Sequence, residues 1–214
     1  MSFHLVEFLA MIAALLIAVI GHEIMHGLAA FAFGDRTAKD AGRLSVNPAR
    51  HIDPLGTIVL PLVLYLSGTP FLFGWAKPVP IDGKKVLERG GHKAMVVVAL
   101  AGVAFNLLLA FVAAQFLNEI APASELNKMP FLDQFISYLI IWNVILAVFN
   151  LLPIPPLDGS NALAHICAYF GIYSVGRFFA RIGMWGMVIL IVILMTDLKL
   201  PIFWLMEAIL SLII

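Results

Sequence analysis

Long apolar runs are the feature of this sequence that most restricts its fold. A helix needs about 20 consecutive apolar residues to cross the hydrocarbon core of a bilayer. Runs of about this length lie at residues 3–33, 94–117, 134–152 and 178–196, and a shorter one closes the chain at 200–214. Apolar residues make up 62% of the 214 residues, against roughly 45–50% in soluble domains. The sequence therefore predicts an all-α polytopic membrane protein.

A sixth apolar stretch, residues 55–75, decides the expected topology. It is interrupted by two prolines and a glycine. The connections on either side of it, 34–54 and 76–93, hold nine of the 13 Lys and Arg residues, whereas the 118–133 connection is mainly acidic. Because cytoplasmic loops carry surplus Lys and Arg, we expect 55–75 to be a re-entrant segment that starts and ends on the cytoplasmic side. The expected total is five to six transmembrane helices, with the N-terminus outside.

Composition also limits the domain organisation and the partners. No Ser/Gly linker, low-complexity tract or repeat divides the chain, so we expect one integral membrane domain over residues 1–214 in contact with the lipid bilayer. The formal net charge is zero, which leaves no basic surplus for phosphate binding and excludes nucleic acid as an expected partner. The first apolar run exceeds the usual length of a signal-peptide core, and we expect it to stay in the mature protein.

The stretch GHEIMHG, residues 21–27, places three ionisable side chains inside the first apolar run. His22 and His26 are four residues apart, so on a helix they project from one face within about 40° of each other. Two imidazoles placed in this way can bind one metal ion. Glu23 lies about 100° around the helix from His22, within reach of a metal-bound water. This is the H-E-x-x-H arrangement of zinc hydrolases, and the alternative is a set of polar residues satisfied by neighbouring helices.

Catalytic zinc generally has three protein ligands and one open position. Asp158, in the stretch NLLPIPPLDGSN, is the best candidate for the third ligand. Three prolines end the preceding apolar helix and stiffen the loop before the aspartate, and Gly159 permits a tight bend there. The alternative is that Asp158 only caps the next helix.

The two motifs together resemble the site-2 protease family of intramembrane zinc metalloproteases, peptidase family M50. HEIMHG in a transmembrane segment and NLLPIPPLDG more than a hundred residues later carry the resemblance. GRLSVNPARHIDPLGT (42–57) and FGWAKPVPID (73–82) are similar to the short form of the family, which lacks PDZ and CBS modules. The resemblance covers most of residues 15–165.

This resemblance implies a fold, a site and a substrate class. The fold would be a three-helix catalytic core within about residues 3–165, with the metal toward the cytoplasm, followed by C-terminal helices at about 178–214. The substrate would be a transmembrane protein or peptide, cleaved at a prokaryotic cytoplasmic membrane. The implied site comprises His22, His26 and Asp158 as ligands of one Zn²⁺ ion, Glu23 as catalytic base, and Asn150 as a polar group that holds the substrate or the oxyanion.

Other functions remain open at this point. Two histidines and an aspartate in a membrane would also serve a metal transporter or sensor without proteolytic activity. The same ligand types occur in non-haem iron enzymes, and a proteolytically silent scaffold is a further alternative. Glu23 discriminates between them, because a general base is essential to hydrolysis and dispensable for transport.

Three more polar residues are candidate members of the site. His51 lies between prolines in a predicted loop and is expected to be structural rather than a rival ligand. His165, seven residues after Asp158, is expected on a helix surface. Asn106 lies among small residues in the 94–117 run, where hydrogen bonding between helices is its expected role and lining of the active site is the alternative.

The remaining expectations concern what surrounds the metal. A ligating histidine usually donates its second ring N–H to an outer partner, and we expect these partners in the region 40–80 or in the helix 134–152. GRLSV, residues 42–46, has strand-like composition and could pair with an extended substrate, although an ordinary loop is the favoured interpretation.

Overall fold

The structure is a computed structural model that describes residues 5–59, 63, 66, 76–120 and 130–213. Within these ranges the chain is largely helical and contains no strand. This confirms the predicted all-α class. Most of the expected re-entrant segment 55–75 lies outside the described residues.

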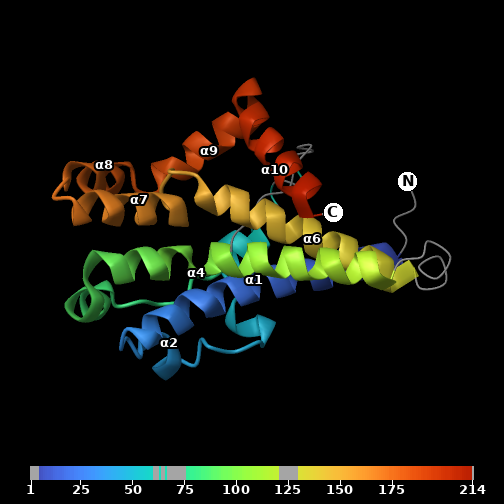
Figure 1. The fold of residues 1–214 in the computed structure, drawn as a ribbon, viewed down its shortest axis with the longest axis horizontal. Helices are drawn as coiled ribbons and strands as arrows, with labels where there is room; N and C mark the ends of the chain where they lie inside the picture. Colours follow the sequence, from blue (N-terminus) through green and yellow to red (C-terminus); the bar gives the residue numbers. More distant parts are fainter. Residues whose placement is uncertain (1–4, 60–62, 64–65, 67–75, 121–129, 214) are drawn as a thin grey trace.

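Three long helices form the centre of the molecule: α1 (Leu5–Ala32), α4 (Gly83–Ile120) and α6 (Pro130–Leu151). Each packs against the other two, and they run side by side along the long axis in Figure 1. On α1, alanines at positions 10, 14 and 18 are fully buried on one face. Small residues at this spacing let neighbouring helices approach closely, and the apolar side chains around them fill the core.

The number of membrane-crossing helices was predicted from apolar runs. Among the described residues, α1, α4 and α6 are long and apolar enough to cross a membrane. A fourth candidate is the pair α8 (Ser174–Ile182) and α9 (Trp185–Met195), which is bent by 79°. The run at 178–196 is divided between these two helices, because the chain breaks at Gly183, which has φ +50°. The total of five to six helices stays a prediction.

The start of α4 differs from the expectation. We predicted a connection over 76–93, but the helix begins at Gly83 and contains a break at Gly91, which has φ 61° and ψ −159°. The Arg89 side chain lies against Gly34, just beyond the end of α1. The connection from α1 to α4 therefore leaves and re-enters at the same end of the bundle (Figure 1), as the charge pattern indicated.

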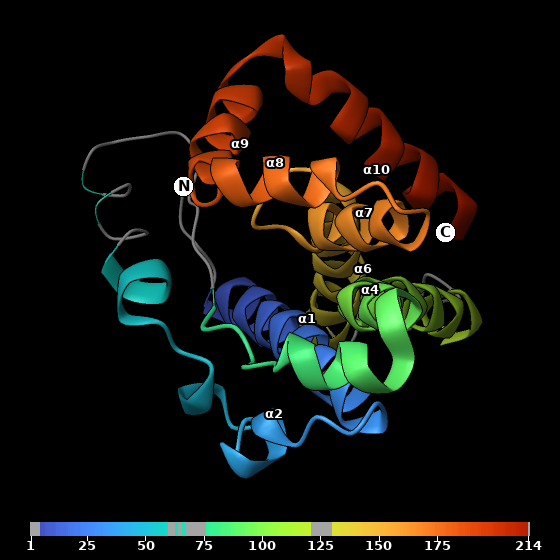
Figure 2. The ribbon, with the colours of Figure 1, turned by 90° about the vertical axis from the view of Figure 1, so that its left-hand side faces the viewer.

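Shorter elements cover the two sides of this bundle. α7 (Asp158–Tyr169) packs against α4 and α8, and α10 (Leu200–Ile213) packs mainly against α6. In Figure 2 the chain from α8 to α10 lies on one side of the three central helices and the α2 region on the other. The remaining short elements are α2 (Thr37–Asp40), 3-10 turns at Pro48–Arg50 and Asp197–Lys199, and a π-helical turn at Pro54–Val59.

Candidate metal centre

Three side chains from two distant parts of the sequence meet beside α4. Nε2 of His22 lies 3.0 Å from Oδ2 of Asp158, Nε2 of His26 lies 3.2 Å from the same oxygen, and the two Nε2 atoms are 3.0 Å apart. Both histidines are 7% exposed. Zinc with tetrahedral bonds of about 2.0–2.1 Å keeps its ligand atoms about 3.3 Å apart. The triangle therefore has the size that one zinc ion requires.

The outer ring nitrogens determine what the triangle can bind. Nδ1 of His26 lies 2.7 Å from the carbonyl oxygen of Val98, which only accepts hydrogen bonds, so Nδ1 carries the proton. Nδ1 of His22 faces Oδ1 of Asn106, which is likewise an acceptor. In the neutral rings both Nε2 atoms then present lone pairs toward each other and toward a carboxylate oxygen. Such a set is stable only around a cation, and it fits zinc.

The outer partners lie on α4, where we did not expect them. We predicted them in the region 40–80 or on 134–152, and this is wrong for both histidines. The Val98 partner is a backbone carbonyl, which no side-chain pattern reveals. Asn106 is fully buried, and its position in an apolar run is the signal that could have identified it.

Close helix packing fixes the His22 ring. Gly102 of α4 faces it directly, and a Cβ atom at position 102 would lie 2.6 Å from three atoms of the imidazole. Real Cβ atoms essentially never approach so closely. Glycine at this position therefore lets α4 approach α1 at the metal centre.

Asp158 reaches the histidines from the first residue of α7. α6 ends at Leu151, and a turn leads directly into α7. The tight bend predicted at Gly159 is wrong, because Gly159 is helical. Its role is close approach, since a Cβ there would lie 2.2 Å from the carbonyl oxygen of Leu151. Asp158 is the first residue of α7, Leu157 is the N-cap, and no side chain caps the helix. The capping alternative is therefore wrong, and the carboxylate contacts both histidines instead.

Glu23 lies on the edge of this face, as the helical rotation predicted. Its Oε2 accepts a hydrogen bond of 2.7 Å from the backbone N–H of Val79. Val79 belongs to the stretch 76–82, which leads into α4. One carboxylate oxygen is thereby fixed by the chain.

Asn150 is placed differently from the other candidates. Its side-chain N–H donates to the carbonyl oxygen of Leu146, one turn earlier in α6, at 3.0 Å. This contact belongs to α6 itself, so the catalytic role of Asn150 stays a prediction.

His51 and His165, which were not expected to be ligands, lie outside the triangle. His51 is 3% exposed and donates from Nε2 to the carbonyl oxygen of Ser45 at 2.8 Å. His165 contacts His92 of α4, with 3.0 Å between their Nδ1 atoms. The 42–46 stretch forms no strand, in line with the favoured loop interpretation.

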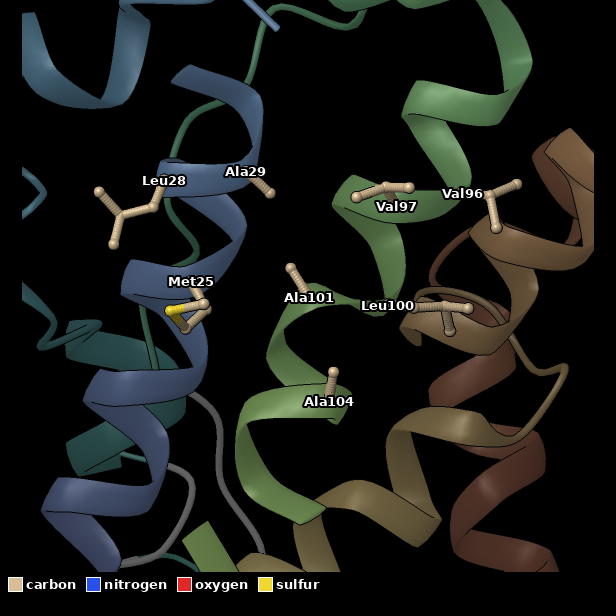
Figure 3. Close-up of a pocket in the computed structure, with 8 residues that line it drawn as sticks. All are labelled: Met25, Leu28, Ala29, Val96, Val97, Leu100, Ala101 and Ala104. Carbon is tan, nitrogen blue, oxygen red and sulfur yellow. The ribbon is translucent and has the colours of Figure 1, made fainter. Parts of the chain in front are cut away.

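An apolar groove of about 540 Å³ flanks the motif helix. Met25, Leu28 and Ala29 contribute from α1, and the rest of its lining comes from α4 (Figure 3). On α1, Met25 lies about 60° from His22 on the side opposite Glu23. All eight lining residues are apolar, so the groove offers no catalytic group, and the chemistry belongs to the triangle.

Comparison with known proteins decides the family. The sequence profile described as Peptidase family M50 matches residues 119–194, a region that contains Asp158. A Bacillus subtilis protein named "Putative zinc metalloprotease YwhC" is 34% identical over 198 residues, which cover 91% of this chain and 84% of the relative. The chain belongs to the site-2 protease family, peptidase family M50.

A second relative of the M50 chain comes from Mycolicibacterium smegmatis. This protein, named "Putative zinc metalloprotease Rip2", is 30% identical over 190 residues, which cover 88% of this chain and 68% of the relative. No solved structure matches the chain. The family and the apolar helices identify a membrane-embedded metalloprotease with zinc as its cofactor.

Proposed function

We propose that this M50 chain is an intramembrane endopeptidase with a single zinc ion held by His22, His26 and Asp158. Its substrates are proteins or peptides with a transmembrane segment, which it hydrolyses in or near that segment. The triangle of the three ligand atoms carries this proposal. His22 and His26 belong to a helix long and apolar enough to cross the bilayer, which supports cleavage at membrane depth.

The residues around the triangle have defined tasks in this reaction. Zinc held by His22, His26 and Asp158 would activate a water and polarise the scissile carbonyl. Glu23 takes the proton from that water and delivers it to the leaving amine. The N–H of Val79 holds Oε2 of Glu23, which leaves the second oxygen for proton transfer. Asn150 is the proposed donor to the oxyanion, which requires its side chain to leave the carbonyl of Leu146 when substrate binds.

The charge of the connections supports an active site near the cytoplasmic side of the membrane. The resemblance to the family supports a prokaryotic cytoplasmic membrane. Gly34 at the end of α1 and Arg89 at the start of α4 lie together, at the end of the bundle that carries most of the basic residues. The histidines lie in the second half of α1, toward this end. Water therefore reaches the triangle over a short path from the cytoplasm.

The decisive experiment compares wild type with Glu23→Gln in liposomes that contain a single-pass membrane peptide. We expect both proteins to bind one zinc ion per chain and only the wild type to cleave the peptide. Glutamine keeps the size of the side chain and its bond from Val79 but cannot accept the proton. Equal cleavage by the two proteins would refute the role of Glu23. Zinc uptake into the liposomes without cleavage of any membrane peptide would instead identify a transporter.

A further inference from the structure

We infer that Asn106 and Asn143 are positioning residues, which fix His22 in the tautomer that binds metal through a chain of amides anchored on α6. The inference rests on the proposed role of His22 as a zinc ligand. It adds two residues of helices α4 and α6 to a site whose ligands come from α1 and α7.

Every polar atom of the Asn106 side chain has a partner. Its Nδ2 donates to the carbonyl oxygen of Ala18 at 3.1 Å and to Oδ1 of Asn143 at 2.7 Å. Its Oδ1 faces Nδ1 of His22. Both hydrogens of the amide are therefore used, and only the oxygen remains for the histidine.

Asn143 determines which way the Asn106 amide points. Nδ2 of Asn143 donates to the carbonyl oxygen of Leu139 at 2.7 Å, so its Oδ1 is the atom presented to Asn106. A rotation of the Asn106 amide by 180° would bring its oxygen against Oδ1 of Asn143 and the carbonyl oxygen of Ala18. The carbonyl oxygens of Ala18 and Leu139 cannot donate hydrogen bonds, so together they determine which way both amides point.

The consequence appears at the metal position. Because Asn106 presents an oxygen, Nδ1 of His22 must carry the proton, and Nε2 is left with its lone pair toward Asp158 and His26. Both asparagines are fully buried, so no water competes for these bonds. A buried amide without partners is costly, which makes the alternative arrangements unfavourable. The α6 backbone thus determines the tautomer of a ligand on α1.

The experiment measures zinc affinity by competition with a chromophoric chelator on the purified full chain. We expect Asn106→Leu to weaken zinc binding by about 10–100-fold, the usual effect of losing an outer partner. Asn143 does not contact His22, so we expect Asn143→Leu to weaken zinc binding too, but by a smaller factor. Asn106→Asp keeps an oxygen toward Nδ1 of His22 and should retain most of the zinc affinity. Its second oxygen would face two acceptors, the Ala18 carbonyl and Oδ1 of Asn143, so we expect a lower melting temperature.

The matched control is Val144→Ala, which truncates the buried neighbour of Asn143 on α6 without touching the amide chain. It should lower the melting temperature and bind zinc as the wild type does. If Asn106→Leu and Asn143→Leu bind zinc as tightly as Val144→Ala does, the asparagines only stabilise the bundle and the inference is wrong.

A second measurement needs no variant. ¹⁵N-histidine NMR of the zinc-loaded wild type should show the His22 proton on Nδ1, and zinc bound through Nδ1 with the proton on Nε2 would overturn the inference. If the wild type shows this tautomer and binds zinc but cleaves no peptide, the proposed peptidase activity is refuted. The inference about Asn106 and Asn143 would still hold.

Discussion

Oδ2 of Asp158 lies 3.0 Å from Nε2 of His22, although 136 positions separate the two residues in the sequence. This contact joins α7 to α1, the helix that carries both histidines. The same oxygen lies 3.2 Å from Nε2 of His26. The three ligand atoms are close enough together to hold a metal ion between them.

We expect Asp158→Asn to remove most zinc binding and all peptidase activity. An amide has nearly the size of the carboxylate but is neutral, and it is a poor zinc ligand. The loss of affinity should exceed the about 10–100-fold typical of losing an outer partner. Metal analysis after dialysis against a weak chelator measures it. Full zinc retention would show that Asp158 is not a ligand.

We expect Gly102→Ala to lower zinc affinity and activity together. The new Cβ would lie 2.6 Å from the His22 ring, so the ring or α4 must move. A misplaced ligand weakens the site even though no polar group is lost. Zinc titration and peptide cleavage of the reconstituted variant check this expectation.

Gly176→Ala in α8 is the matched control for Gly102→Ala. A Cβ there meets only Ala164, at an ordinary distance of 3.8 Å. Alanine in a helix stabilises by roughly 0.5–1 kcal/mol relative to glycine, so this variant should bind zinc normally. If Gly176→Ala lowers zinc affinity as much as Gly102→Ala does, the contact with His22 does not explain the effect at position 102.

The apolar runs predicted the central helices well because length and apolarity are properties of a segment by itself. α1 and α6 begin and end within a few residues of the predicted runs. The spacing of His22 and His26 likewise follows from helix geometry alone. Apolarity alone did not predict the bend between α8 and α9, which lies at Gly183, a residue type that tolerates its φ of +50°.

The surroundings of the ligands were harder to predict than the ligands. Asn143 was missed, although a lone asparagine in the apolar stretch IIWNVIL indicates a hydrogen bond between helices. The Val98 carbonyl and the Val79 N–H were out of reach, because backbone groups carry no sequence signal. Which carbonyl faces His26 depends on the register between α1 and α4, and which N–H faces Glu23 depends on the course of the non-helical stretch 76–82.

We expect Asp35→Asn to reduce the free energy of unfolding by about 1–3 kcal/mol, the usual effect of leaving buried partners unsatisfied. Asp35 is fully buried and accepts hydrogen bonds from Thr37 and from the N–H of Asp82. Asparagine would turn an N–H group toward one of these donors. Denaturant titration in detergent micelles measures the change.

Asp40→Asn is the control for Asp35. Asp40 forms an exposed pair with Arg36 at 3.7 Å, and such pairs contribute little, so the change should stay within about 0.5 kcal/mol. Burial by itself raises the pKa of Asp35, but the hydrogen bonds from Thr37 and Asp82 and the Lys85 charge outweigh it and lower the pKa. The contribution of Asp35 is therefore complete above its ordinary pKa of 3.8 and is lost as the pH falls below that value.

The final prediction concerns the contact between His165 of α7 and His92 of α4. Burial and the neighbouring His92 lower the pKa of His165 below its ordinary value of 6.5. The unfolded chain therefore binds more protons than the folded one as the pH falls below 6.5, and stability decreases in that direction. We expect the melting temperature of the wild type to fall between pH 7.5 and pH 5.5, and that of His165→Gln to fall by less. Both proteins share every other titrating group, so the difference between the two shifts reports on His165. Equal shifts would show that this contact between α4 and α7 does not respond to pH.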